Sequence, residues 1–367
     1  MMAVSAKSTH STPQFEARGM PLGLSSGRRL RVDTERRFLP RFENWGSAPS
    51  NVSRRVGFLV GLFLFLAMAA NGWSQNTELQ GTIKVSGAWA LYPMMVTWGE
   101  EFRKLHPRVR IDVSAGGAGK GVVDALAGIA DLGMVSREIS PEEVKRGAFF
   151  IPVVKDAVFP TMNDRNPILK KGPLERGVKK QAFIDLWIHG KALTWGDLAG
   201  IPSKDKISVY TRSDSCGAAE TWAQYLGKKN QEDLKGVGVY GDPGLAEAVR
   251  KDLLGIGYNN LGFAYDFKAG LPLAGIRIIP IDVNENGKID PEEELKTKKQ
   301  AIRAVAKGIY PSPPARELYL ATKDNFRGLT KVFVRWIVTD GQKYVEEMGY
   351  VKLIPAHANE ALKKVGN

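Results

Sequence analysis

Between Gly81 and Ser136 the sequence alternates short apolar runs with longer amphipathic ones. The runs GTIKVSG, VRIDVSA and ADLGMVS have the length of strands, and LYPMMVTWGEEFRKL and KGVVDALAGI have the apolar spacing of helices between them. A strand–helix–strand–helix–strand order favours a parallel sheet, because each helix carries the chain back before the next strand pairs. We therefore predict an α/β fold.

A second α/β stretch follows, with the predicted strand KISVYTR and the predicted helix AAETWAQYLG, before the chain returns to apolar strands and a helical tail. This order predicts two lobes with mixed, mostly parallel sheets joined by two crossovers. We place residues 76–154 and 274–367 in lobe I and residues 155–273 in lobe II. Architectures of this kind hold ligands in the crevice near the carboxyl ends of the strands.

Residues 1–75 are predicted to be a leader that contributes nothing to the lobes. The first 50 residues are polar and Arg-rich without periodicity, which is typical of disorder or of sequence upstream of the true start codon. The apolar run GFLVGLFLFLAMAA that follows is short for a membrane span and fits the core of a signal peptide. We expect export to the periplasm or another extracytoplasmic location, with a retained membrane anchor as the alternative.

The net charge of +13 does not indicate a nucleic-acid partner. Residues 76–367 carry 42 Lys and Arg against 35 Asp and Glu, without a basic block interleaved with aromatic residues. The four histidines are dispersed, and no motif of a hydrolase or redox enzyme is present. We therefore expect neither a nucleic-acid-binding protein nor an enzyme.

Three loops each end a predicted strand and open a predicted helix: SGAWALYP, SAGGAGKG and TRSDSCGAAE. Backbone N–H groups and the positive end of the helix favour an anion at such a place. The second loop adds the Ser114 hydroxyl and the small Gly117, and the third adds the Arg212 guanidinium, which Asp214 can orient as a bidentate partner. Taken singly, each loop is also compatible with a plain tight connection.

These loops, together with ADLGMVSRE, FIDLWIHGKALTWGDL, GIGYNNLGFAY, YPSPPARELYLATK and GQKYVEEMGYVKLIP, occur in an order that resembles the phosphate-binding receptors of ABC importers. These receptors belong to the type II periplasmic-binding-protein superfamily. The resemblance runs from about Gly81 to Pro355 and implies a two-lobed monomer that delivers phosphate, or a similar oxyanion, to an ABC permease. It implies ligand-binding roles for these residues: Trp89, Ala90, Leu91, Ser114, Ser136, Arg137, Arg212, Cys216, Gly217 and Ala218. The loops themselves add Gly117, Asp214 and Ser215 to the predicted site.

The chain departs from this family where hydroxyl side chains are common. Ala88 to Leu91 of the first loop, and Cys216 and Ala218 of the third, offer none. Each buried hydrogen bond to a charged ligand contributes roughly 1.5–3 kcal/mol, so the ligand can differ from phosphate. The alternatives are a receptor for another oxyanion or a phosphorylated organic solute, with Trp89 as a wall, and an exported calcium-stabilised scaffold that has no transport ligand.

Cys216 is the only cysteine, so no intrachain disulfide can form. A thiol at a helix N-terminus has a lowered pKa and can be reactive. The sequence provides no neighbouring base, however, and packing is the favoured role of Cys216.

The segment DVNENGKIDPEE has the spacing of an EF-hand calcium loop. Oxygen ligands fall at positions 1, 3, 5, 7, 9 and 12, and Gly287 stands at the sharp bend. The segment LAGIRIIPI before it is a predicted strand, and EELKTKKQAIRAVAKG after it is a predicted exiting helix. We predict a structural Ca²⁺ on these residues: Asp282, Asn284, Asn286, the Lys288 carbonyl, Asp290 and Glu293.

Overall fold

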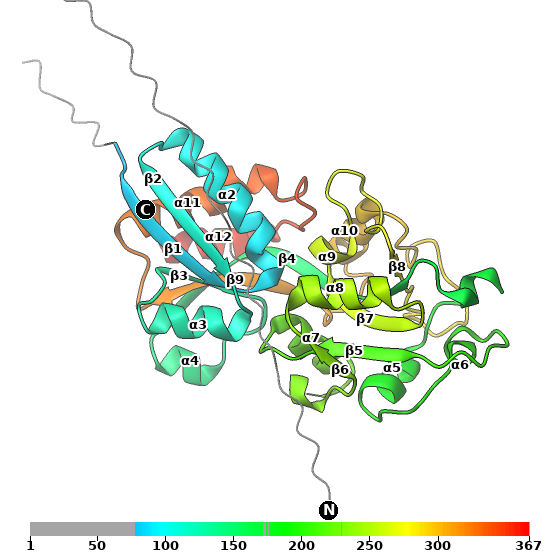
Figure 1. The fold of residues 1–367 in the computed structure, drawn as a ribbon. Coiled ribbons are helices and arrows are strands. Elements are labelled where there is room, and N and C mark those ends of the chain that lie inside the picture. The colour runs from blue at the N-terminus through cyan, green and yellow to red at the C-terminus, as the bar shows by residue number, and fades with distance from the viewer. Residues whose placement is uncertain (1–77, 172–173, 175, 229, 367) are drawn as a thin grey trace, which may run out of the picture. The chain divides into compact units, whose positions relative to one another are not determined.

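The computed structural model describes residues 78–366 apart from 172, 173, 175 and 229 (Figure 1). The predicted disordered leader, with its signal peptide or anchor, lies outside these residues. Within the described part, no helix is both long and apolar enough to cross a membrane.

Nine strands are present in the described residues. In chain order they are β1 (Gly81–Gly87), β2 (Val109–Ala115), β3 (Leu132–Val135), β4 (Ala148–Asn163), β5 (Ser208–Arg212), β6 (Val237–Val239), β7 (Gly255–Asn260), β8 (Ile276–Ile278) and β9 (Ala315–Lys323).

The strands hydrogen-bond in the order β2-β1-β3-β9-β4-β7-β5-β6, and β8 pairs with β4. The parallel pairs lie at the two ends of this order, where β1 pairs with β2 and β3, and β5 pairs with β6 and β7. The antiparallel pairs lie in the middle. The α/β fold with mixed sheets is therefore confirmed, and the βαβαβ order of the first strands is as predicted.

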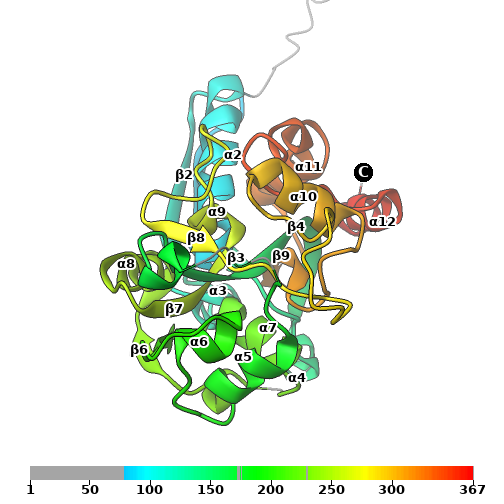
Figure 2. The ribbon, with the colours of Figure 1, turned by 90° about the vertical axis from the view of Figure 1, so that its right-hand side faces the viewer.

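The long strand β4 lies in the middle of the sheet order and pairs with strands on both sides of it. Its first part pairs with β9, and its last residues pair with β7 and β8. Figures 1 and 2 both show β4 and β9 side by side between the two groups of parallel strands. These two strands carry the chain between the two halves, as the predicted crossovers require.

Helices cover both groups of parallel strands (Figures 1 and 2). In chain order they are α2 (Tyr92–Leu105), α3 (Ala118–Leu126), α4 (Pro141–Lys145), α5 (Lys180–Trp187), α6 (Trp195–Ala199), α7 (Gly217–Tyr225), α8 (Gly241–Lys251), α9 (Leu261–Ala264), α10 (Lys298–Ala306), α11 (Gly328–Val338) and α12 (Pro355–Val365). Short 3₁₀ turns occupy Trp89–Leu91, Pro167–Lys170, Gln231–Asp233 and Asp340–Tyr344.

Local sequence explains where several of these helices begin. Helix α2 has proline in its first turn, where the missing N–H leaves no bond unmade, and it buries a stripe that includes Met94, Trp98 and Phe102. Helix α4 begins with the predicted capping box, in which the Ser140 hydroxyl accepts from the Glu143 N–H and the Glu143 carboxylate accepts from the Ser140 N–H.

The predicted helix after the calcium-loop sequence begins later than expected. Residues 291–293 form a turn, residues 294–297 are not helical, and α10 starts only at Lys298. The reason is a second capping box, in which the Thr297 hydroxyl accepts from the Gln300 N–H and the Gln300 side chain accepts from the Thr297 N–H.

The buried side chains form two apolar cores. One is built from β1, β2 and β3, their helices, the start of β4, most of β9 and the C-terminal helices. The other contains apolar side chains from Ala157 to Tyr265 together with side chains from Ile278 to Ala315. Residues 278–315 thus pack with the second core, although the sequence assignment put them in lobe I. The lobe boundaries as such stay a prediction.

Candidate functional site

Charged side chains meet at the carboxyl ends of β5 and β7. Arg212 is the last residue of β5 and Asn260 the last of β7, and these two strands are parallel neighbours. Helix α8 begins beside them with Asp242 in its first turn. This edge of an α/β sheet is the place where ligands are expected, because the strand-to-helix loops converge there.

The Arg212 side chain is fully buried and lies between two carboxylates. Its Nε donates to Asp214 Oδ1 at 2.8 Å, and its Nη2 donates to Asp214 Oδ2. Its Nη1 lies 2.9 Å from Asp242 Oδ1 without the alignment of a hydrogen bond. Although burial opposes the charged form, the two carboxylates raise the pKa of Arg212 above its usual range. The guanidinium is therefore a permanent positive charge inside the protein.

A second arginine, Arg316, joins this cluster from β9. It stands opposite Asp156 of β4 in the antiparallel pair, and its Nη1 lies 3.4 Å from Asp156 Oδ2. Its Nε donates to the Ser136 carbonyl at 3.1 Å, and its Nη2 donates to Asn260 Oδ1. Asn260 in turn donates to Asp242 Oδ1 at 2.8 Å. One polar network thus links β4 and β9 to the Arg212 cluster.

Asp156 has no solvent exposure, and its Oδ2 has no hydrogen-bond partner. Burial raises the pKa of this carboxyl to about 6, and nearby Arg316 opposes part of that increase. The pKa of Asp242 is also raised by burial, against the attraction of Arg212 and Arg316. The cluster therefore contains acids that gain protons more readily than exposed ones.

Glycines bring the second and third loops into contact. A Cβ atom on Gly117 would lie 2.3 Å from the Ser215 carbonyl oxygen, and one on Gly119 would lie 2.5 Å from Ser215 Oγ. A Cβ atom on Gly217 would lie 2.1 Å from the Ser136 carbonyl oxygen. A side chain at Gly117 or Gly217 would collide with a backbone carbonyl oxygen, so glycine at these positions allows the start of α3 to approach Ser215 and the start of α7 to approach Ser136.

Trp89 of the first loop packs against the start of α8. A Cβ atom on Gly241 would meet the Trp89 ring at 3.4 Å, and the Tyr92 ring is tilted against it at 6.1 Å between centroids. Trp89 Nε1 is buried without an acceptor. The indole therefore places an unused N–H donor next to the helix that carries Asp242.

Other predicted ligand residues have different surroundings. Ser114 is exposed, and its hydroxyl donates to the Val85 carbonyl at 3.3 Å. Both Arg137 terminal nitrogens donate to the Glu143 carboxylate, at 3.0 and 2.8 Å. The structure gives neither side chain a contact with Arg212.

Three further predicted residues are small or apolar and buried in the cores: Ala90, Leu91 and Ala218. The Ala90 carbonyl accepts from the Tyr350 hydroxyl at 2.7 Å. Any ligand contact of these residues would have to come from their backbone. Their predicted roles in binding stay predictions.

Cys216 caps helix α7 rather than facing solvent. Its Sγ accepts from the Ala219 N–H at 3.3 Å, and its own N–H donates to Gln231 Oε1 at 2.9 Å. Burial raises the pKa of the thiol to about 12, and this outweighs the attraction of the Arg212 charge. The tertiary structure therefore makes Cys216 a packed thiol with little thiolate at neutral pH.

Sequence reasoning did not single out Asp156, Asp242, Asn260 or Arg316. Two signals were available: Asp156 interrupts the apolar run AFFIPVVKDAVFP, and Arg316 stands at the start of the strand ARELYLATK. A charge inside an apolar run requires a partner, but the sequence does not say which one.

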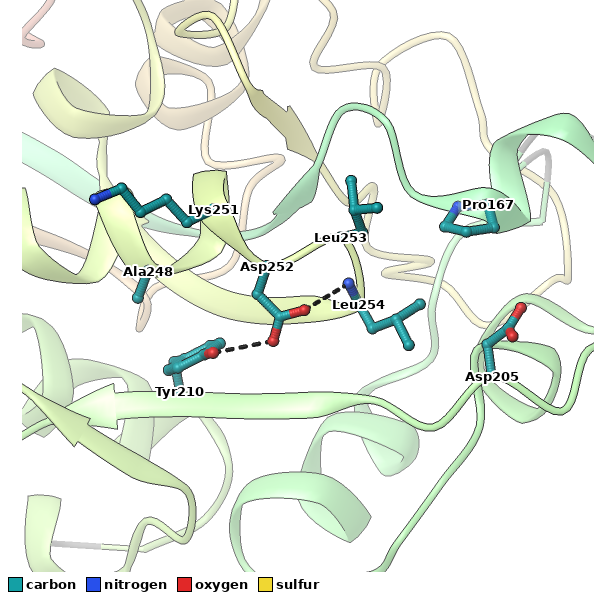
Figure 3. A pocket seen from close by; sticks show the side chains of 8 residues that line it. All are labelled: Pro167, Asp205, Tyr210, Ala248, Lys251, Asp252, Leu253 and Leu254. Atoms are coloured by element: carbon teal, nitrogen blue, oxygen red, sulfur yellow. Dashed lines mark hydrogen bonds between the residues drawn. The ribbon is translucent and has the colours of Figure 1, made fainter.

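A pocket of about 690 Å³ lies at the opposite edge of β5 and β7 (Figure 3). Figure 3 shows Asp252 there, with one carboxylate oxygen accepting from the Tyr210 hydroxyl and the other from the Leu254 N–H, each at 2.9 Å. Lys251 is paired with Glu247. With its charged groups already engaged, this pocket is a weaker candidate for an anion than the Arg212 cluster.

Comparison with known proteins agrees with this geometry. Residues 74–341 match the family model of the PBP superfamily domain. This chain belongs to the PBP superfamily. The phosphate-binding protein PstS of Staphylococcus aureus (strain USA300) is 26% identical over 301 residues, which cover 79% of this chain and 84% of that protein. PstS of Staphylococcus epidermidis is 26% identical over 289 residues, covering 76% and 81%.

Solved structures show the same fold. A putative phosphate ABC transporter substrate-binding protein from Clostridium perfringens, with bound phosphate, is similar with a TM-score of 0.61 and 19% identity, over 75% of this chain and all of that one. An ABC-type phosphate transport receptor from Vibrio cholerae has a TM-score of 0.54 and 18% identity, over 74% of this chain and all of that one. The two-lobed PBP fold is therefore confirmed. Membership of a family of binding proteins also agrees with the expectation that the chain is not an enzyme.

Proposed function

We propose that this PBP superfamily member is the extracytoplasmic substrate-binding protein of an ABC importer and that its ligand is phosphate or a similar oxyanion. The observation that carries the proposal is the fully buried Arg212 guanidinium at the carboxyl edge of β5. The PstS relatives, which bind phosphate by name, support the choice of ligand.

Near this edge Trp89 Nε1 is buried without an acceptor, and Arg212 Nη1 and Arg316 Nη1 have ion-pair partners at 2.9 and 3.4 Å but no aligned hydrogen bond. A buried donor without an acceptor costs roughly 1–3 kcal/mol, and more when the donor is charged. An oxyanion supplies several acceptor oxygens at once, so its binding would remove such costs. The starts of α3, α7 and α8 add backbone N–H groups and the positive ends of three helices.

The contact of Ser215 with Gly117 suggests how the ligand is enclosed. In this proposal the two lobes part to admit the anion and then close, bringing the α3 and α7 loops together over it. Closure excludes water, which strengthens every charge interaction inside the site. The closed surface is then what the permease recognises.

A second candidate is an exported scaffold without a transport ligand. The observation that favours it is that Arg212 is already neutralised by Asp214 and Asp242. An anion entering beside two carboxylates gains less than one meeting a free guanidinium. The Trp89 ring packs on Gly241. This contact makes Trp89 a weaker candidate for a wall that stacks on an organic solute.

Location and partners follow from the same proposal. We infer that the run GFLVGLFLFLAMAA directs export, either as a cleaved signal peptide or as a retained anchor. We also infer that the exported protein works as a monomer next to an ABC permease. Fractionation of the producing cells, with the N-terminus of the mature protein determined, tests the first inference.

Calorimetric titration of the full chain, freed of phosphate, tests the ligand. Phosphate, sulfate, molybdate and methylphosphonate are titrated in turn, and we expect phosphate to bind most tightly. Arg212→Lys keeps the charge but loses the two-pronged geometry, so we expect at least a tenfold loss of affinity. The control is Arg110→Lys, an exposed arginine of β2, with affinity unchanged within about twofold.

The outcomes separate the candidates. Tighter binding of sulfate, molybdate or methylphosphonate assigns a different oxyanion to the same site. No heat with any of the four anions, together with an intact fold, contradicts the receptor proposal and leaves the scaffold.

A further inference from the structure

The segment from Asp282 to Glu293 lies between β8 and α10 and takes no part in the Arg212 network. Its first and last residues are unusual for charged side chains, since Asp282 is 1% exposed and Glu293 7% exposed. Within the described part of the chain, no Lys, Arg or His forms an ion pair with either carboxylate. The two ends of this segment are therefore buried carboxylates that have no positively charged partner.

Asp282 carries the decisive observation. Its Oδ2 accepts from the Gly287 N–H of the same loop at 2.9 Å, so the carboxylate points into the loop. Its Oδ1 is buried without any hydrogen-bond partner. Leaving a charged oxygen without a partner away from water is costly, and a bound cation is one way to compensate it.

Glu293 closes the loop from its other end. Its Oε1 accepts from the Val283 N–H at 2.9 Å, and its Oε2 accepts from the Asp290 N–H at 3.1 Å. The two oxygens therefore join the beginning and the end of the segment. A bidentate carboxylate at the twelfth position has the same place in a calcium-binding loop.

Amide and carboxylate oxygens occupy the positions between these ends. Asn284 Oδ1 accepts from the Asn286 N–H at 3.1 Å, and Asn286 Oδ1 accepts from the Lys288 N–H at 2.8 Å. Both amide groups donate to Asp290 Oδ2. Among the described residues no three His, Cys, Asp or Glu side chains converge as a metal cluster, so a site here has to draw on amide and backbone oxygens as well.

We propose that residues 282–293 bind one Ca²⁺ through oxygen atoms of Asp282, Asn284, Asn286, Asp290 and Glu293 and through the Lys288 carbonyl. The donor set is all oxygen, which suits a hard cation and excludes the metals that prefer sulfur or imidazole. Six or more ligands on a flexible loop favour Ca²⁺ over the smaller Mg²⁺, which requires near-ideal octahedral geometry.

The position of the loop gives the ion a structural role. The Asp282 N–H donates to the Val178 carbonyl at 3.1 Å, and Leu295, just after the loop, is buried in the core that contains Ala301 of α10. Calcium on the loop therefore stabilises the second core where residues 278–315 join it. Because none of its ligands contacts Arg212, Ca²⁺ leaves the oxyanion site unchanged.

Calcium titration and thermal unfolding of the full chain test the proposal. The protein is treated with a chelator, the chelator is removed, and CaCl₂ or MgCl₂ is added. We expect heat of binding with one Ca²⁺ per chain, and a melting temperature higher by about 5 °C at a calcium concentration 100 times the dissociation constant. Mg²⁺ is expected to produce a smaller shift at the same concentration.

Three variants distinguish carboxylates that bind Ca²⁺ from carboxylates that only stabilise the loop. Asp282→Asn and Glu293→Gln are expected to abolish the calcium-dependent shift, whereas the control Glu292→Gln, at an exposed neighbour outside the ligand positions, keeps it. With chelator present, Asp282→Asn should melt no lower than the wild type, because it removes a buried charge without a partner.

Two results overturn the proposal. One is the absence of both calcium heat and a calcium-dependent melting shift in the wild type. The other is an Asp282→Asn variant that keeps the full calcium-dependent shift, since the shift then arises elsewhere on the protein.

Discussion

The carbonyl oxygen of Ser215 lies 2.3 Å from the point where a Cβ atom on Gly117 would stand. The two residues belong to loops at the starts of α7 and α3, about 100 residues apart in sequence. Gly117 also has φ of +90°, which side chains rarely adopt. This contact joins the two halves of the candidate site, so a single methyl group tests whether the loops must close on a ligand.

We predict that Gly117→Ala weakens phosphate binding by tenfold or more, because the loops can no longer approach each other. Gly128→Ala is the matched control. Its φ of +71° is also positive, but an added Cβ would meet nothing within 4 Å. Calorimetry of the two variants should show loss of affinity only for Gly117→Ala. Equal affinities would mean that binding does not require this contact.

Asp156 predicts a pH dependence of stability. Its pKa rises from 3.8 to about 6 on folding, so the folded protein holds this proton more tightly than the unfolded chain. This tighter proton binding stabilises the folded protein. Its contribution to the free energy of unfolding is fully present below about pH 4 and is lost as pH rises through 6, a change of about 3 kcal/mol. The raised pKa of Asp242 contributes with the same sign.

The measurement is the free energy of unfolding of wild type and Asp156→Asn between pH 4 and pH 7. As pH rises, the free energy of unfolding of the wild type should fall relative to that of Asp156→Asn. Asp112→Asn, at a half-buried position of β2 beside Arg110, serves as the control with a constant difference. A constant difference for Asp156→Asn as well would contradict the raised pKa.

The packed thiol of Cys216 should be unreactive. With its pKa near 12, little thiolate exists at pH 8, and the side chain is 5% exposed. We expect a disulfide reagent to label the native protein at least 100 times more slowly than the protein unfolded in guanidinium chloride. Rapid labelling of the native form would show that the loop around Cys216 opens.

Arg137 was assigned to the ligand shell from the sequence, and the structure pairs it with Glu143. We predict that Arg137→Gln lowers the melting temperature but changes phosphate affinity by less than threefold. A half-buried bidentate ion pair stabilises more than an exposed one, and its loss leaves Glu143 without a positive partner. A tenfold loss of affinity would place Arg137 at the ligand after all.

Much of the fold could be predicted from local patterns. The strands and helices from Gly81 to Val135, the capping box at Ser140 and the helix after Cys216 depend on apolar periodicity and on side chains within three residues of each other. The start of α10 was predicted too early. The helical pattern continues through the residues before Thr297, but the capping box at Thr297 begins the helix there.

The sequence by itself determined the α/β fold and the position of Arg212 at a strand end, since both depend on residue order. Only the tertiary structure decided what surrounds Arg212. Asp242 and Arg316 come from α8 and β9, which are distant in sequence, and burial rather than sequence position sets the pKa of Asp156 and Cys216. Charge pairing and desolvation depend on three-dimensional proximity, and no local pattern encodes it.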